Sequence, residues 1–292
     1  MVFLEASGRK LSLPDHISPV ERDVSHPPVD GELSGIRPVS PSDENPPWNL
    51  VDVLAIAVFS FVTGLIILML AMGVAHSLPR FRNVPLAQLG QNALILVPAQ
   101  TVAYLIVVAF MAQLVRLKQG GNLLKAVSWN APSAQRAVGA IAVGVGLALV
   151  SAIFTGFLSR WMPKSLPVDK LFRDASSAYL LALFGVIVAP FVEELFFRGF
   201  LYPALARRIG ASASMVLTAA AFAVVHQGQL ARAWVPLSWL FIVGMVLTYV
   251  RMKTKSVATC VFIHTVYNVT IFTLFFIGTQ GFRHLDQSSW IM

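Results

Sequence analysis

From Trp48 onward, the chain repeats long apolar stretches that are separated by short polar connections. A helix that crosses about 30 Å of hydrocarbon needs roughly 20 residues, and most of these stretches reach that length. We expect membrane-spanning helices near 51–75, 92–115, 137–158, 178–203, 212–230, 234–250 and 256–279. The fourth to sixth of these stretches contain charges or are short. The pattern predicts an all-α membrane protein, a bundle of about seven (six to eight) transmembrane helices.

The first 47 residues have a different composition, with eight prolines, eight acidic residues and four basic ones. Such a segment cannot bury enough apolar surface to offset its ordering entropy, so we predict that it is mostly disordered. No apolar stretch typical of a signal peptide follows its first charges. The predicted organisation is a Pro-rich acidic tail over 1–47, a helical bundle over 48–282 and a short C-terminal tail over 283–292.

Composition supports a membrane protein. Hydrophobic residues make up 56% of the chain and charged residues 12%, against about 45–50% and 25% in soluble domains. The single cysteine, Cys260, excludes an intramolecular disulfide and a metal site built on several thiolates. We therefore expect a multi-pass protein integral to the cell membrane, in contact with the lipid bilayer.

The net charge of +8 does not indicate a nucleic-acid partner, because the basic residues fall mostly between apolar stretches, as topology signals do. Nine of them lie on one side of the predicted bundle and eight on the other. The small excess is on the side that holds the connections near 116–136 and 207–212. We expect this side, and the N-terminus with it, to be cytoplasmic.

Three clusters of polar residues lie inside the apolar stretches. An ionisable residue within a span costs at least a few kcal/mol and usually marks a functional site. The clusters are Glu193, Glu194 and Arg198 in the fourth stretch, His226 in the fifth, and His264 with Asn268 in the seventh.

Helical spacing indicates which of these residues share a helix face. Glu194 and Arg198 are four residues apart, so they share a helix face and can pair. Glu193 is rotated from Glu194 by about 100° and must face a different neighbour. An alternative is that all three form only a buried ionic contact, although such a contact needs one carboxylate rather than two.

The second cluster is placed near the first by the short link around Gly210, a predicted helix stop. Glu193 and His226 lie about 16 residues to either side of it, so in a helical hairpin both should be roughly 20–24 Å below the turn. His264 and Asn268 share one face of their helix. The alternative for both clusters is hydrogen bonding between packed helices.

These residue types together permit water activation and oxyanion stabilisation. A carboxylate in a desolvated site can act as a general base, and a histidine beside it can share the proton. An imidazole and a side-chain amide one turn apart can donate to the oxygen of a tetrahedral intermediate. We expect no cofactor. One Glu and two His could instead bind zinc with a second Glu as base, but the HExxH spacing is absent.

In this order, Glu193-Glu194-xxx-Arg198, Phe222-xxx-His226 and His264-xxx-Asn268 resemble the three motifs of the CPBP family of intramembrane endopeptidases. This family includes CAAX prenyl endopeptidases and bacteriocin-processing and self-immunity proteins. The resemblance covers about residues 50–280, and no motif position departs from the pattern. It implies that Glu193 and His226 activate water, that His264 and Asn268 form the oxyanion hole, and that Glu194 and Arg198 support the site.

The leading hypothesis is a glutamate-dependent intramembrane endopeptidase, which hydrolyses a peptide bond in a membrane-bound or lipid-modified protein or peptide. Its site would open to the cytoplasmic side. The alternative is a non-catalytic membrane scaffold, immunity or regulatory protein of the same family. A proton-coupled transporter would also place Glu and His in the membrane, but the paired internal repeats typical of transporters are not found in the sequence.

Overall fold

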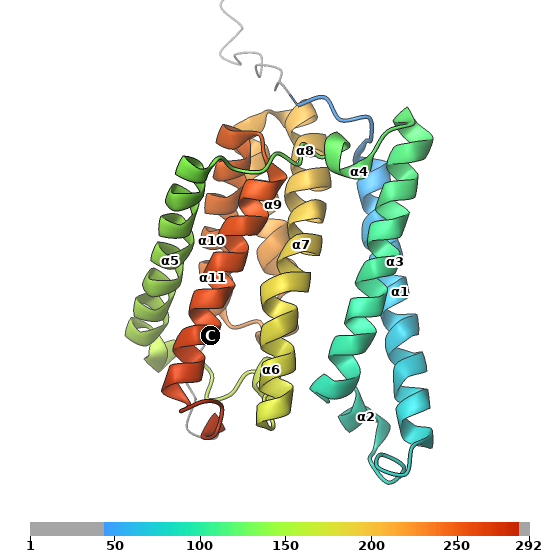
Figure 1. Cartoon of the computed structure of the whole chain (residues 1–292), viewed down its shortest axis with the longest axis vertical. Helices are drawn as coiled ribbons and strands as arrows, with labels where there is room; N and C mark the ends of the chain where they lie inside the picture. Colours follow the sequence, from blue (N-terminus) through green and yellow to red (C-terminus); the bar gives the residue numbers. More distant parts are fainter. Residues whose placement is uncertain (1–43, 286–292) are drawn as a thin grey trace, which may run out of the picture. The chain divides into compact units, whose positions relative to one another are not determined.

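A computed structural model describes residues 44–285, which belong to one compact unit of the chain. The predicted disorder of 1–43 and the end of the C-terminal tail, 286–292, lie outside the described residues. The helices of the described region are α1 (Leu50–Ser77), α2 (Leu86–Leu89), α3 (Ala93–Gln119), α4 (Leu123–Ala126), α5 (Ala134–Phe157), α6 (Ala175–Leu183), α7 (Ala189–Glu194), α8 (Tyr202–Ile209), α9 (Ala211–Val225), α10 (Trp234–Thr254) and α11 (Val257–Gly278) (Figure 1).

Six helical segments in the described region are long and apolar enough to cross a membrane. They are α1, α3, α5, the continuous segment Ala175–Ile209 that contains α6 to α8, α10 and α11. The fifth predicted span differs, because α9 has only 15 residues and extends about 22 Å. It ends at Val225, and the chain then turns through 226–233 before α10 begins. The chain is thus an integral multi-pass membrane protein with an all-α bundle.

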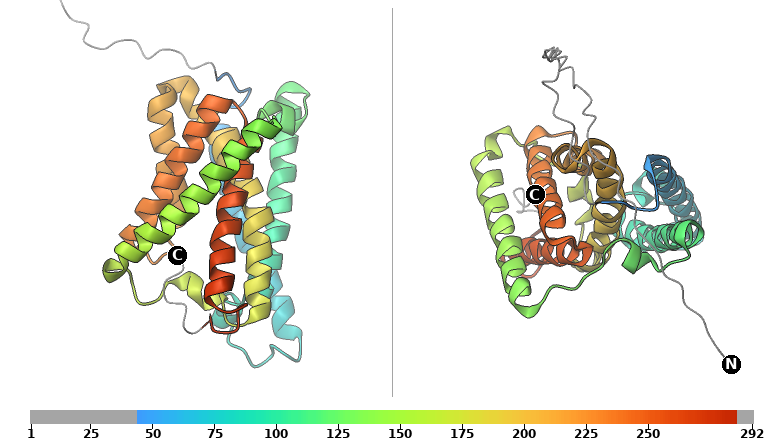
Figure 2. Two further views of the ribbon diagram at one scale, coloured as in Figure 1. Left: turned by 60° about the vertical axis from the view of Figure 1, so that its left-hand side comes forward. Right: turned by 90° about the horizontal axis from the view of Figure 1, so that it is seen from above.

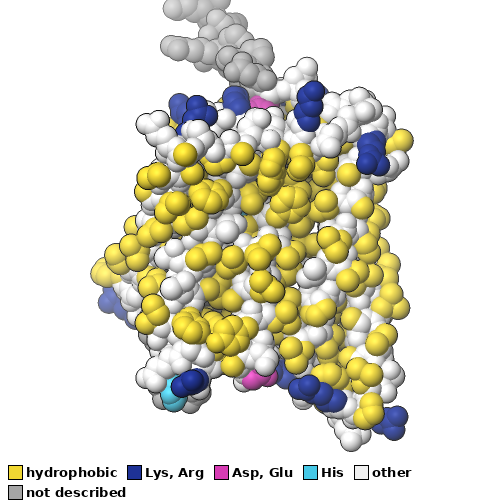
Figure 3. Space-filling view, viewed as in Figure 1, with side chains coloured by type: hydrophobic (Ala, Val, Ile, Leu, Met, Phe, Trp, Pro, Cys, Tyr) yellow, Lys and Arg dark blue, Asp and Glu magenta, His cyan; other side chains and the backbone are white. Residues whose placement is uncertain are grey.

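The outer surface of the bundle suits a hydrocarbon environment. Hydrophobic side chains cover the middle of the face shown in Figure 3, and Lys and Arg gather toward its two ends. Phe61, Leu105 and Ile153 are each more than 60% exposed on α1, α3 and α5. Exposed apolar area on this scale would be costly in water and is favourable against lipid.

The helices pack in neighbouring pairs: α1 against α3, α5 against α11, and α9 against α10. Figure 2 shows α5 crossing the face of the bundle obliquely. The close crossing of α5 and α11 depends on Gly144, where an added Cβ would lie 2.7 Å from Cγ1 of Val266 and 2.9 Å from the carbonyl of Ile263. A small residue at such a position lets two helix backbones approach each other.

The end of the bundle that holds Trp48, here called the N-terminal end, also holds the connections around α4 and Gly210 (Figure 1). The predicted helix stop at Gly210 is confirmed, since its φ of +79° ends α8. Residues within the predicted tail also contact this end: Arg207 donates to the carbonyl of Pro46 at 2.9 Å. The connections 78–92 and 158–174 lie at the opposite end (Figure 1).

The fourth span is not a regular α-helix throughout. Two π-helical stretches, Phe184–Val188 and Leu195–Leu201, flank the six-residue helix α7 that carries both glutamates. Each stretch is followed within two residues by a proline, Pro190 or Pro203. Proline has no N–H to donate and disturbs the regular ladder. Such π-bulges occur often at functional sites.

Candidate active site

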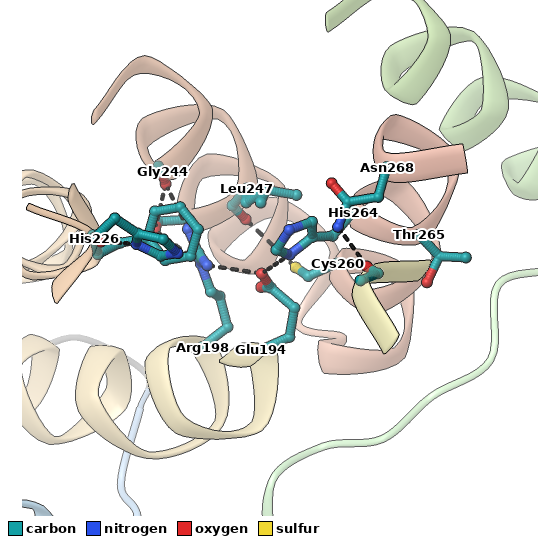
Figure 4. A network of polar contacts seen from close by, with 12 residues as sticks. Glu194, Arg198, His226, Gly244, Leu247, Cys260, His264, Thr265 and Asn268 are labelled. Atoms are coloured by element: carbon teal, nitrogen blue, oxygen red, sulfur yellow. Dashed lines mark hydrogen bonds and ion pairs between the residues drawn. The ribbon is translucent and has the colours of Figure 1, made fainter. Parts of the chain in front are cut away.

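The predicted pair of Glu194 and Arg198 is present. Arg198 Nη1 lies 2.8 Å from Glu194 Oε1, and both side chains are fully buried. The guanidinium also contacts α10, through Nη2 to the carbonyl of Gly244 at 3.0 Å and Nε to Thr248 Oγ1 at 3.3 Å (Figure 4). All three guanidinium nitrogens therefore have partners, and the charge joins the fourth span to α10.

The same carboxylate oxygen also contacts the third cluster. His264 Nδ1 lies 2.8 Å from Glu194 Oε1 (Figure 4), whereas Glu194 Oε2 has no hydrogen-bond partner among residues 44–285. Sequence spacing did not predict this contact. A carboxylate beside Arg198 accepts the Nδ1–H of His264, which directs the other ring nitrogen, Nε2, away from Glu194.

His226 lies at the end of a helix rather than within a span, because α9 stops at Val225. Its Nδ1 lies 2.7 Å from the carbonyl oxygen of Phe222, one turn back. A carbonyl only accepts, so Nδ1 carries the hydrogen and Nε2 of the neutral ring keeps its lone pair. The local backbone therefore fixes the tautomer in which His226 can accept a proton.

Asn268 donates from Nδ2 to the carbonyl of Gly185 at 2.6 Å. In this π-helical stretch Ala189 N–H pairs with Phe184 O, five residues back. The next bond in that register would run from Pro190 to Gly185, and proline has no donor. Asn268 of α11 supplies the missing donor to the carbonyl of Gly185. Its second amide N–H remains free to donate to another acceptor.

Four predicted residues meet at one cavity of about 570 Å³: Glu193, His226, His264 and Asn268 all line it. Glu194 and Arg198 do not belong to its lining. The helical rotation between Glu193 and Glu194 thus places one carboxylate on the cavity and the other behind it, against Arg198 and His264.

The cavity extends from these residues to the end opposite the N-terminal end, where Lys164, Asp169 and Gln229 line it. The sequence led us to expect a cytoplasmic N-terminus and a site that opens to the cytoplasm. Lys164 and Asp169 lie toward the end of the bundle opposite Trp48, so a site entered past these residues would not open on the side of the N-terminus. Both expectations stay predictions.

Further polar side chains in the cavity wall were not singled out from the sequence. Trp239 Nε1 donates to Tyr267 Oη at 3.2 Å, and Tyr267 Oη donates to Ser151 Oγ at 3.3 Å. Gln100 and Tyr104 of α3 line the cavity as well. Their polar character inside apolar stretches was the available signal.

In the described part of the chain, no three His, Cys, Asp or Glu side chains gather closely enough to hold a metal ion. Glu194, which touches His264, is engaged by Arg198. The zinc alternative needs the two histidines and a glutamate at one point, and the absence of a cofactor stays a prediction.

Comparison with protein families gives a match to the model described as type II CAAX prenyl endopeptidase Rce1-like, over residues 175–270. Comparisons with curated proteins and with solved structures gave no match. The matched region contains all six residues of the three clusters and runs from α6 into α11. This match supports the assignment of this chain to the CPBP/CAAX endopeptidase family.

Proposed function

We propose that this protein is a glutamate-dependent intramembrane endopeptidase that hydrolyses a peptide bond in a membrane-associated or lipid-modified protein or peptide. The observation that carries the proposal is that Glu193, His226, His264 and Asn268 line the same cavity. A family of proteases matches residues 175–270, which include these four lining residues. Most of the remaining wall is apolar, as a binding site for a membrane-borne chain requires.

In the proposed reaction, Glu193 takes a proton from water while the water oxygen bonds to the carbonyl carbon of the substrate. His226, with Nε2 available as an acceptor, hydrogen-bonds the same water. The proton is then delivered to the nitrogen of the scissile bond, the C–N bond breaks, and the amine leaves.

The carbonyl oxygen becomes negative as water attacks. His264 and the second N–H of Asn268 would donate to it. Since Nδ1 of His264 donates to Glu194, donation to the substrate must come from Nε2, so the imidazole is protonated on both nitrogens at that step. Glu194 orients the ring through this contact, and Arg198 holds Glu194.

The test is cleavage of candidate membrane substrates by the purified protein, in detergent or in liposomes, with and without a chelator. Glu193→Gln keeps the volume and hydrogen bonding of the side chain but cannot accept a proton. We expect a loss of about 10²–10⁴-fold in rate, the scale of general-base catalysis, with little change in stability. Lys118→Gln, which removes only a surface ion pair with Asp52, should cleave as well as the wild type.

The results separate the alternatives. Chelator-resistant cleavage that depends on Glu193 supports the proposal, whereas chelator-sensitive cleavage would require a metal. A biological activity that persists in Glu193→Gln would favour the non-catalytic scaffold, because a scaffold tolerates a near-isosteric amide.

A further inference from the structure

The segment before α1 is attached to the fourth span. Trp48 Nε1 donates to the carbonyl of Phe200 at 3.1 Å, and the two rings are 4.4 Å apart. Arg207 donates to the carbonyl of Trp48 at 3.1 Å, in addition to its contact with Pro46. These contacts hold the segment from residue 44 to 48 beside the π-helical stretch Leu195–Leu201.

That stretch contains a carbonyl that its own backbone cannot satisfy. Tyr202 N–H donates to Phe197 O, five residues back. In the same register, the carbonyl of Arg198 would receive its bond from Pro203, which has no N–H. A buried carbonyl without a partner costs free energy comparable to a lost hydrogen bond.

Arg251 of α10 supplies the missing donor. Its Nε lies 3.1 Å from the carbonyl oxygen of Arg198, and its side chain is 2% exposed. The arrangement parallels that of Asn268 at Gly185, where a side chain from a neighbouring helix replaces a donor that a proline lacks. In both cases the replacement lies within one turn or so of α7, which carries the site glutamates.

Glu44 holds Arg251 in place. Its two carboxylate oxygens accept from Nη1 at 3.0 Å and from Nη2 at 3.2 Å, and Lys255 contacts Oε1 at 3.2 Å. This fork-to-fork pairing fixes the plane of a guanidinium more firmly than a single contact does. Continuous contacts therefore run from Glu44 through Arg251 to the backbone of Arg198, and from its side chain through Glu194 to His264.

We propose that Arg251, held by Glu44, is a positioning residue for the hydrolytic site, and that the segment just before α1 is part of that site's support. The inference rests on the proposed function for its catalytic consequence. Arg251 fixes the backbone from which Arg198 reaches Glu194, so a shift there turns the ring of His264. Misplacement of a reacting group by about 1 Å can cost up to about 100-fold in rate.

The experiment uses the full chain in nanodiscs with the variants Glu44→Gln and Arg251→Lys. The first weakens the bidentate pairing, and the second keeps a charge for Glu44 but removes the Nε donor to Arg198. Lys255→Gln is the matched control, because Lys255 also contacts Glu44 but does not contact Arg198. Two signals are recorded: kcat and KM on a substrate that the wild type cleaves, and the ¹⁵N resonances of labelled histidines, with that of His264 identified by its loss in His264→Gln.

Both variants should lower kcat by about 10- to 100-fold with KM unchanged, and both should shift the His264 resonance, whereas Lys255→Gln should do neither. Folded variants with wild-type kcat and an unmoved resonance would overturn the inference. If Arg251→Lys does not fold, Glu44→Gln alone decides. If the wild type cleaves nothing, the proposed function fails, but the resonance still reports whether Glu44 is coupled to His264.

Discussion

His264 Nδ1 lies 2.8 Å from Oε1 of Glu194, and that oxygen is the one that Arg198 also contacts. Glu194 therefore links two helices. It lies with Arg198 in the fourth span, and it contacts His264 of α11. A buried carboxylate with two such partners is compensated in charge, and the imidazole it holds has a fixed orientation toward the cavity.

Arg198→Ala should destabilise the bundle by about 3–5 kcal/mol, because it leaves Glu194 as a buried charge whose remaining partner is His264. The measurement is thermal or denaturant unfolding in detergent. Lys118→Ala serves as control, since the pair of Lys118 and Asp52 is partly exposed and such pairs contribute about 0–1 kcal/mol. Equal stability of the two variants would contradict the role of Arg198 as support.

The pairing of Glu194 with Arg198 could be predicted because both residues lie on one helix, where spacing alone sets the geometry. The contact of Glu194 with His264 could not, since it depends on how α11 crosses α7. For the same reason, the sequence places Arg251 only among the basic residues that indicate membrane topology, because its partner Glu44 is 207 residues away. The all-α membrane fold was predictable from apolar length, which the hydrocarbon thickness fixes.

The end of α9 had a signal in the sequence. The predicted span runs to residue 230, but residues 226–229 are His, Gln, Gly and Gln, and the backbone turns at His226, whose ring bonds back to Phe222. The change from apolar to polar residues after Val225 marks where the helix stops. The prolines at 190 and 203 were a readable signal of unsatisfied carbonyls in the fourth span, although they do not reveal which side chains supply the donors.

Asn268→Ala should lower the cleavage rate by about 10²–10³-fold if its second N–H donates to the oxyanion. Thr265→Val is a matched control on the same helix. Thr265 also donates to a carbonyl of the fourth span, that of Val186 at 3.2 Å, but it does not belong to the cavity lining. Each variant loses one interhelical hydrogen bond. If the two have similar stability but Asn268→Ala has the lower kcat, the difference in kcat measures the contribution of Asn268 to catalysis. Equal rates would assign Asn268 to packing.

Gly144→Ala should destabilise the contact of α5 with α11, because the new methyl group would meet Val266 and a backbone carbonyl at under 3 Å. Overpacking of this kind costs about 1–3 kcal/mol. Gly139→Ala, on the same helix with nothing within 4 Å of the added atom, should leave unfolding unchanged or raise stability slightly. A loss of stability in Gly139→Ala as large as that in Gly144→Ala would exclude close helix approach as the cause.

The last prediction concerns the side to which the cavity opens. Lys164 lies in its wall and is exposed, and Lys125 is exposed at the N-terminal end. Cys260, the natural cysteine, is fully buried, so Lys164→Cys and Lys125→Cys each add a single reactive thiol. A membrane-impermeant maleimide applied to sealed vesicles should label one variant from outside and the other only after the membrane is opened.

Labelling of both variants from one side would contradict the helix arrangement on which the site rests. With opposite labelling, the known orientation of the vesicles decides which of the two expectations holds, the cytoplasmic N-terminus or the site that opens to the cytoplasm. If Lys164 faces the cytoplasm, the cavity receives cytoplasmic substrates, and the nine-to-eight distribution of basic residues does not set the orientation. If Lys125 faces the cytoplasm, the orientation predicted from the excess of basic residues is correct. The cavity then receives its substrates from the opposite side of the membrane.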